Sequence, residues 1–461
     1  MMMRPRALTA LTRFGLGPRP GEMKAIGDDP AGYLRDQLQD PGVAIVTDPI
    51  LYDRTSLRKR YMVVRTAYRE ARKALRDGAT EAEIAAEEAA RMGNRALVKS
   101  VVDPEVEARF NHAVATNAAF VERLVMFWSN HFAIEAKSGF PVRLTVGNFE
   151  REAIRPHVLG YFEDMVAAAT THPAMLYYLD NARSVGPNSQ RGRRRGVASA
   201  NENLARELME LHTLGAGGGY TQEDVVELAK AMTGWLGGFH PSGNGLIYEE
   251  RVHEPGYRTV LGKTYGAGGQ TQLEEIIPDL ALHPSTARHI ATKFARHFVA
   301  DGAPDALIEK LRTTFLDTGG DLRAMTLALI DSDVAWDSAP KKTVPPYDFM
   351  IAAARATGST LPGPFIRRSA RDLAQQVWMP PSPAGWPSDD NAFLGGDAML
   401  ERVDFARQIA RRFSTAGRAD ELAIKLFGDA LDPFVEEAVD RAEDQSQGLV
   451  LLLMSPPFHR R

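Results

Sequence analysis

Two glutamates and an asparagine recur at helical spacing near the middle of the chain. Asn203, Glu207 and Glu210 stand at i, i+4 and i+7, so an amide and two carboxylates share one edge of a predicted helix. If that edge is buried, a desolvated carboxylate gains the raised pKa that suits a general acid or base. Arg206 lies four residues before Glu210, however, and such a pair is also typical of a solvated helix face. The spacing alone leaves both interpretations open.

Histidines in distant segments are candidate partners for these carboxylates. They are His131, His172 and His253. Imidazole and carboxylate ligands around an open coordination position are what a hydrolytic zinc site or a non-haem iron site requires. One hypothesis is therefore a divalent metal held by His131, Glu207 and His253, with Glu210 as a second carboxylate. The Glu-x-x-His pairing of di-iron bundles is absent, because Glu210 is followed by His212 two residues later.

The same residues also suit a site without a metal. The candidate catalytic residues are Glu207, Glu210, His131 and His253. The candidate substrate-binding residues are Asn130, Asn203, Trp128, Asp180, His172 and Trp386. Two alternatives compete with these roles. Buried histidines and asparagines commonly satisfy backbone polar groups, and a tryptophan between prolines, as in PAGWP at 383–387, can simply fasten a loop to the core.

Several other chemistries are excluded by the sequence. The chain has no cysteine, which rules out disulfides, thiolate metal ligands and cysteine nucleophiles. The glycine-rich run 215–219 lacks the preceding strand and the following Lys-Ser/Thr of a phosphate-binding loop. No Gly-x-Ser-x-Gly motif supports a serine hydrolase. A net charge of −4 argues against nucleic acid as a partner that covers the surface.

The elements that position the central residues are predicted to be helical. Ser199 and Glu202 form a capping-box pattern that predicts the start of the central helix, and Gly215 predicts its end. Thr221 and Asp224 repeat the capping-box pattern for the next helix. The glycine between two such helices indicates a tight helix–loop–helix unit.

Other segments have patterns of their own. A basic run at 54–73 followed by an acidic run at 77–88 predicts an antiparallel helical hairpin. Short apolar runs punctuated by Gly, Pro and Asn at 236–265 predict a small β-hairpin. The arginine-rich stretch 182–198 is either a lid that attracts an acidic substrate or a solvated loop. One further predicted helix carries, at i, i+4 and i+8, the residues His289, Lys293 and His297.

These patterns together predict a mostly α protein, a multi-helix globular bundle with a small β-hairpin insertion near 236–265. At 461 residues the chain is long enough for one large core or for two domains. We expect a single large helical unit over residues 1–461. The alternative is a pair of packed halves, 1–235 and 266–461, on either side of the β insertion.

Several longer motifs occur in an order that resembles a known family. They are RFGLGPRPGE near the start, FWSNHF at 127–132, HPAMLYYLDN at 172–181, HPSTARHIATKFARHFV at 283–299, PAGWP at 383–387 and LLLMSPPF at 451–458. The chain resembles the bacterial family known as domain of unknown function 1800, from about Leu8 to Arg460. The resemblance implies no particular reaction, since the family's activity is unknown. Relatives are often encoded beside another exported uncharacterised family, which suggests a protein partner.

The function hypotheses fall into three classes. The first is an enzyme with a His/Glu pocket, performing metal-assisted hydrolysis of a small molecule or polymer. The second is a non-catalytic binding or assembly module that acts with a partner protein, and the third is a haem or redox protein, although no attachment motif is present. No stretch approaches the roughly 18 apolar residues of a membrane span. No signal peptide is visible, so the sequence as written predicts a cytoplasmic protein, or an exported one if a leader has been removed.

Overall fold

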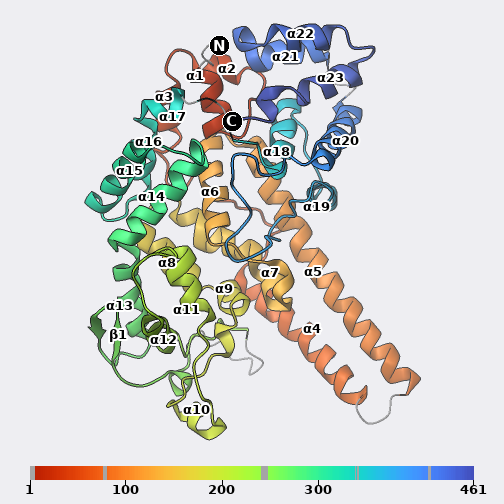
Figure 1. Ribbon diagram of the computed structural model, residues 1–461. Helices are drawn as coiled ribbons and strands as arrows, with labels where there is room; N and C mark the ends of the chain where they lie inside the picture. Colours follow the sequence, from red (N-terminus) through yellow and green to blue (C-terminus); the bar gives the residue numbers. More distant parts are fainter. Residues whose placement is uncertain (1–5, 76–79, 240–247, 338, 340–341, 414–416) are drawn as a thin grey trace.

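The computed structural model is mostly α-helical (Figure 1). It describes residues 6–75, 80–239, 248–337, 339, 342–413 and 417–461. Within these residues the strands form one antiparallel hairpin, β1 (Arg258–Val260) with β2 (Lys263–Tyr265). The two residues of its turn, Leu261 and Gly262, both have positive φ, as the tightest hairpin turns require. The predicted fold class is confirmed, and residues 240–247 of the predicted insertion lie outside the described residues.

A long helical arm projects from the rest of the molecule (Figure 1). It consists of α4 (Arg54–Ala74) and α5 (Glu81–Ala115), which pack against each other as the predicted antiparallel hairpin. Thr80 and Glu83 form a complete capping box at the start of α5. Near the base of the arm, the apolar side chains that join the helices are Leu57, Tyr61, Leu97 and Val101.

The largest hydrophobic core gathers helices from the first three-quarters of the chain. They are α1 (Arg6–Thr9), α2 (Glu22–Ile26), α3 (Pro30–Asp36), α6 (Ala119–His131), α7 (Phe140–Phe149), α8 (Phe162–Thr171), α9 (Pro173–Tyr178), α11 (Asn203–Glu207), α12 (Gln222–Ala231), α13 (Gln270–Ala281), α14 (Pro284–Phe298), α15 (Asp305–Asp317) and α16 (Leu322–Ile330). α17 (Asp333–Asp337) also belongs to this core through Ala335 and Trp336, and the short helix α10 (Gln190–Arg195) lies between α9 and α11 in sequence. Trp128 is at the centre of this core, 1% exposed and packed on Phe162.

A second hydrophobic core is formed by the C-terminal helices. They are α18 (Pro346–Thr357), α19 (Gly363–Asp372), α20 (Gly396–Phe413), α21 (Ala419–Phe427), α22 (Pro433–Asp440) and α23 (Gln445–Leu453). Leu8, Leu16 and Phe110, from far earlier in the chain, are also buried in this core. The division into packed halves 1–235 and 266–461 stays a prediction.

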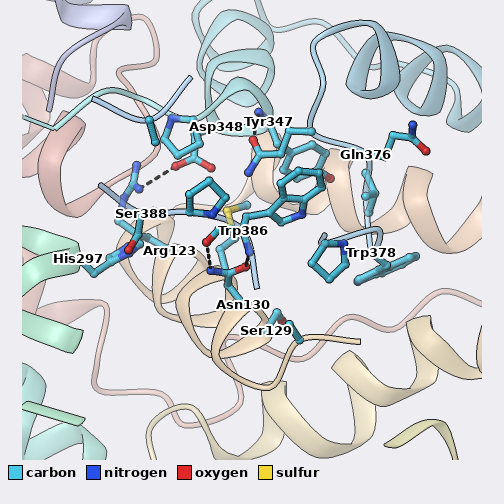
Figure 2. A pocket seen from close by; sticks show the side chains of 18 of the residues that line it. Arg123, Ser129, Asn130, His297, Tyr347, Asp348, Gln376, Trp378, Trp386 and Ser388 are labelled. Carbon is cyan, nitrogen blue, oxygen red and sulfur yellow. Dashed lines mark hydrogen bonds and ion pairs between the residues drawn. The ribbon is translucent and has the colours of Figure 1, made fainter. Parts of the chain in front are cut away.

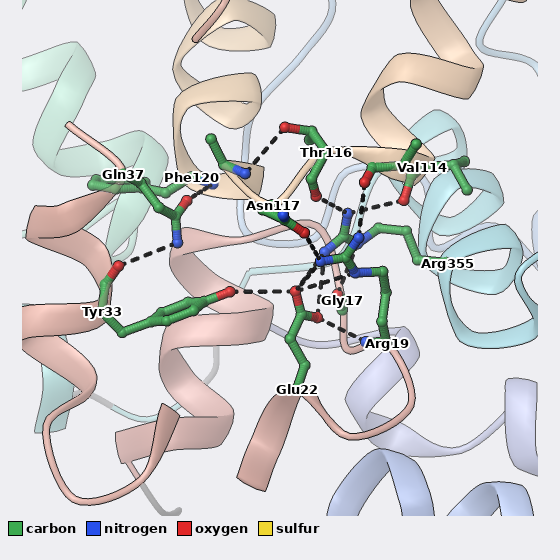
Figure 3. A network of polar contacts seen from close by, with 12 residues as sticks. Gly17, Arg19, Glu22, Tyr33, Gln37, Val114, Thr116, Asn117, Phe120 and Arg355 are labelled. Atoms are coloured by element: carbon green, nitrogen blue, oxygen red, sulfur yellow. Dashed lines mark hydrogen bonds and ion pairs between the residues drawn. The ribbon is translucent and has the colours of Figure 1, made fainter. Parts of the chain in front are cut away.

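A buried guanidinium connects the N-terminal segment to both cores (Figure 3). Arg355 of α18 donates hydrogen bonds to the backbone oxygens of Gly17, Val114 and Thr116, each at 3.1 Å. The same guanidinium pairs with Glu22 at 3.1 Å. Because a buried charge is stable only when its donors are satisfied, this set of contacts holds α18 and the corner between α5 and α6 against the N-terminal segment.

The central helix departs from its predicted form. It begins at Asn203, not at a cap on Ser199, and after Glu207 it continues as a π-helical turn, η7 (Leu208–His212). The Glu202 side chain makes no capping hydrogen bond, because it accepts from Arg206 and from Gln222 instead. The wider π turn rotates later residues away from the α-helical face that the spacing predicts. The capping box of Thr221 and Asp224 at the start of α12 is confirmed.

Candidate functional site

A cavity of about 120 Å³ lies between α6, α7, the start of α18 and the segment 374–393 (Figure 2). We call the segment 374–393 the strap. Six aromatic side chains line the cavity, namely Phe132, Phe149, Tyr347, Trp378, Trp386 and Phe393. The uncharged polar side chains that line it include Ser129, Asn130, Gln375 and Gln376. Apolar walls with a few polar groups are typical of a site for a small molecule.

Asn130 at the end of α6 holds the strap over the cavity (Figure 2). Its amide nitrogen donates to the Trp386 oxygen at 3.1 Å, and its amide oxygen accepts from the Trp386 nitrogen at 2.8 Å. Gly385 permits this approach, because a Cβ at that position would lie 2.5 Å from the Asn130 backbone oxygen. The structure therefore brings Asn130 and Trp386 together, with the asparagine bound to the strap backbone and the indole as a cavity wall.

The strap backbone is strained at three points. Ala374, Trp378 and Phe393 have φ values of 60°, 52° and 64°, in the left-handed region that side chains other than glycine disfavour. Each such residue costs about 1–2 kcal/mol relative to ordinary backbone. Strain of this kind persists where surrounding contacts hold it, and it is concentrated at ligand sites.

Glu150 forms one polar wall of the cavity. It accepts hydrogen bonds from Arg109 Nε at 2.7 Å, Ser129 Oγ at 3.0 Å and Trp378 Nε1 at 3.4 Å, and it pairs with Arg155 at 2.8 Å. Burial alone would raise the pKa of Glu150, but Arg109 and Arg155 lower it to about 2. The carboxylate is therefore ionised and already fully engaged.

Buried cations also line the cavity, and Figure 2 shows one of them, Arg123, on the side away from Trp378. The Arg123 side chain is 2% exposed, and its Nη1 lies 2.9 Å from Asp348 Oδ2. Lys342 is equally buried, and its Nζ reaches Asp301 at 3.2 Å and Asp390 at 3.1 Å. Both cations are thus paired with carboxylates.

Arg461 is the exception among these cations. Its Nη1 lies 3.5 Å from His297 Nε2, and its Nε is buried without a hydrogen-bond partner. No side-chain carboxylate of the described residues forms an ion pair with it. Burial and the charge of Arg123 lower the pKa of Arg461 to about 9. Burial and the surrounding cations lower the pKa of His297 well below its usual range, so the imidazole is neutral.

A second polar cluster joins the end of α6 to the central helix and α14. Lys293 Nζ lies 2.9 Å from His131 Nδ1, and His131 Nε2 lies 3.0 Å from the His212 backbone oxygen. His289 Nε2 lies 3.1 Å from the Leu211 oxygen. Burial and the nearby ammonium lower the pKa of His212 to about 3 and that of His289 to about 4, and burial lowers the pKa of Lys293 to about 8. Three neutral imidazoles therefore surround one amine.

The hypothetical metal ligands are not gathered into a site. Among the described residues, no three His, Cys, Asp or Glu side chains are grouped so that they could hold a metal ion. His131 uses both ring nitrogens in the contacts above, and His253 Nδ1 lies 2.9 Å from the Thr233 oxygen. These hydrogen bonds engage both ring nitrogens of His131 and one of His253. The ligand set His131, Glu207 and His253 stays a prediction.

The predicted catalytic carboxylates, Glu207 and Glu210, lie near other acidic groups. Glu207 and Glu210 are both half-buried. Burial and the Glu210 charge raise the pKa of Glu207, which is the direction a general acid needs. Burial and the charges of Glu135 and Glu207 raise the pKa of Tyr178 to about 12. Glu207 thus belongs to an acidic patch with Glu135, Glu210 and Tyr178.

A comparison with known protein families identifies one family whose model matches the chain. The family described as protein of unknown function (DUF1800) matches residues 9–460. The chain belongs to this family. No curated protein and no solved structure matches it. In the part of this DUF1800 member that the structure describes, none of the helices has the length and apolar character needed to cross a lipid bilayer.

The remaining predicted residues of this DUF1800 member lie apart from the cavity. Trp128 is a core residue, and His172 caps α9 by accepting from the Ala174 nitrogen at 3.1 Å. Asp180 and Asn203 are exposed. Asp180 has a positive φ of 59°, a backbone conformation that aspartate tolerates better than most residues.

Several cavity and cluster residues were not among the sequence candidates. The cavity residues are Arg109, Arg123, Glu150, Lys342 and Arg461. These residues come from distant segments and follow no regular spacing in the sequence. No sequence pattern could therefore have predicted that they lie together. Lys293 and His289 did have a signal, because they stand four residues apart on one face of α14.

Proposed function

We propose that this DUF1800 member binds a small organic anion in the cavity beneath the strap. The observation that carries the proposal is Arg461, whose buried guanidinium lines the cavity without a carboxylate partner among the described residues. A buried cation without an anionic partner is unfavourable by several kcal/mol, and an anion bound beside it offsets much of that penalty. The buried charged groups Glu150, Arg123 and Lys342, which also line the cavity, already have partners and do not need a ligand to offset their charge.

The walls of the cavity limit the size and shape of the anion. A volume of about 120 Å³ is slightly smaller than the cavity of about 150 Å³ that accommodates benzene in another protein. The ligand therefore has on the order of six non-hydrogen atoms. Trp386, Tyr347 and Phe132 present apolar faces to it. A monocarboxylate with a short apolar or aromatic body fits both the charge and the walls.

Thermal unfolding with matched ligand pairs tests the proposal. Propionate, butyrate and 2-furoate would be compared with their uncharged amides at the same concentration and ionic strength. A ligand that binds only the folded protein stabilises it by about 2.7 kcal/mol at a concentration of 100 Kd. We expect at least one carboxylate to raise the unfolding temperature while its amide does not. Equal shifts within every pair, or no shift at all, would refute the proposal.

The contact between Lys293 and His131 favours a second candidate, an enzyme that uses the Lys293 amine as a general base. Donation by Lys293 to His131 Nδ1 leaves Nε2 to donate to the His212 oxygen, so one imidazole tautomer is fixed. Burial lowers the pKa of Lys293 to about 8, so a substantial fraction of the amine is neutral near pH 8.

An NMR titration of ¹³C-labelled lysine distinguishes this candidate. A lysine signal that titrates near pH 8 and is lost in Lys293→Met supports it, whereas a midpoint near the usual value of about 10.4 removes it. Metal-assisted hydrolysis by His131, Glu207 and His253 is not supported by the grouping of the described residues. A role as a binding or assembly module with a protein partner stays a prediction.

A further inference from the structure

An open cleft of about 710 Å³ lies next to the cavity and is lined by residues of α5, α7 and α19. Gln376, Val377 and Trp378 of the strap line both the cleft and the cavity. The apolar surface of the cleft is formed mainly by Val98, Val102, Val106, Phe140, Pro364 and Met379. A recess of this size is typical of sites for molecules as large as cofactors.

The charged side chains of the cleft are almost all of one sign. Seven cations line it, namely Arg95, Lys99, Lys137, Arg143, Arg367, Arg368 and Arg371. Asp103 is the one carboxylate among the lining residues, and it is paired with Arg367. The whole chain has a net charge of −4, so this concentration of positive charge is local and not a general property of the protein.

Most of these cations have no partner among the residues that the structure describes. Arg371 pairs with the neighbouring Asp372, and Arg143 donates to the Ala136 oxygen at 3.4 Å. The cations that form no hydrogen bond or ion pair with a described residue are Arg95, Lys99, Lys137 and Arg368. They come from three separate elements, α5, the turn before α7, and α19. Several elements therefore contribute cationic side chains without a described ion-pair partner to the lining of one cleft.

Like charges held around a recess repel one another, and apolar walls strengthen their field inside it. A ligand with several negative charges removes that repulsion. Guanidinium groups suit phosphate in particular, because two parallel N–H groups match two phosphate oxygens. We propose that the cleft binds an organic molecule with two or more phosphate groups on an apolar or aromatic body, as in a nucleoside triphosphate.

The shape of the cleft favours a compact ligand over a macromolecule. Its cations line one recess together with apolar side chains, whereas a nucleic-acid backbone requires an extended basic track. Trp378, Phe140 and Met379 can contact the body of the ligand while the cations contact its phosphates. The cleft is a different site from the anion cavity, and its ligand does not depend on Arg461.

A fluorescence titration tests the proposal on the full-length protein. The probe is trinitrophenyl-ATP, with tripolyphosphate as competitor, at an ionic strength of 0.15 M. The cleft variant combines Arg95→Gln, Lys99→Gln and Arg368→Gln, three exposed residues without partners in the described chain. The control variant makes the same change of charge on α4, with Arg69→Gln, Arg72→Gln and Lys73→Gln, which are exposed on the arm.

We expect saturable binding that tripolyphosphate displaces. The cleft variant should bind at least about tenfold more weakly, since even one lost charge-assisted hydrogen bond is worth roughly tenfold, and the α4 variant should match the wild type. Arg461→Gln should also bind the probe normally, which separates this site from the cavity. Equal loss in the cleft and α4 variants would overturn the proposal, as would no binding. So would binding confined to a single-stranded oligonucleotide or to vesicles of anionic phospholipid, which would indicate a macromolecular partner.

Discussion

Substitution of one glycine should release the strap. Gly385 has a φ of +90°, and a Cβ there would lie 2.5 Å from the Asn130 backbone oxygen and 2.7 Å from its side-chain oxygen. Gly385→Ala therefore introduces left-handed strain of about 1–2 kcal/mol. It also forces Asn130 away from the two hydrogen bonds with Trp386, each worth about 0.5–1.5 kcal/mol. Together these effects favour strap opening by roughly 2–5 kcal/mol.

Hydrogen exchange at the Trp386 amide measures this opening. The amide is protected by its hydrogen bond to Asn130, so its exchange rate follows the free energy of opening. A change of roughly 2–5 kcal/mol accelerates exchange by roughly 30- to 3000-fold, while helices outside the strap keep their protection. Gly395→Ala is the matched control, because its Cβ meets no atom within 4 Å and its φ is not left-handed. Unchanged exchange in Gly385→Ala, or equal acceleration in the control, would show that the strap is not held as described.

Three further predictions concern the charged network and the caps. The pKa of Glu150 is lower in the folded protein than in the unfolded chain, so its ionised carboxylate stabilises the fold at pH values above the unfolded-state pKa. The free energy of unfolding of the wild type, measured in urea, should therefore fall as the pH drops from about 4.5 toward 2. Glu150→Gln should flatten that part of the pH profile. Arg355→Met should lower the free energy of unfolding, measured in urea, by about 3–5 kcal/mol, because it breaks a buried ion pair. Arg407→Met, which removes an exposed ion pair, should lower it by under about 1 kcal/mol. Thr221→Ala should cost about 1 kcal/mol, whereas Ser199→Ala, at a position that caps no helix, should be neutral by the same assay. A flat pH profile in the wild type, or equal costs within either pair, would contradict these assignments.

Local patterns in the sequence predicted local structure well. The capping box of Thr221 and Asp224 depends only on contacts within one helical turn, and it is present. The arm of α4 and α5 follows from helices joined by a short connection, with caps at Asp53 and Thr80. The pattern at Ser199 and Glu202 was wrong because Glu202 binds Gln222, twenty residues later, and no local rule contains that contact.

The candidate site depends on contacts that sequence spacing does not encode. Asn130 and Trp386 were both predicted to bind substrate, but their direct contact joins residues 256 positions apart. The π turn at Leu208–His212 breaks the 3.6-residue period on which the shared edge of Asn203, Glu207 and Glu210 was based. The cavity cations stand at separate places in the chain, and only the packed fold shows which of them lacks a carboxylate.

Calorimetric titration at pH 7 tests the central claim most directly. The carboxylate that most stabilises the protein would be titrated into the wild type, Arg461→Gln and Arg460→Gln. Arg460 is adjacent in sequence, but its side chain does not line the cavity. We predict one binding site per chain, at least about tenfold weaker in Arg461→Gln and unchanged in Arg460→Gln, because a hydrogen bond to a charged group contributes about 1.5–3 kcal/mol. Equal affinity in all three proteins, or no heat of binding in the wild type, would contradict an anion site at Arg461.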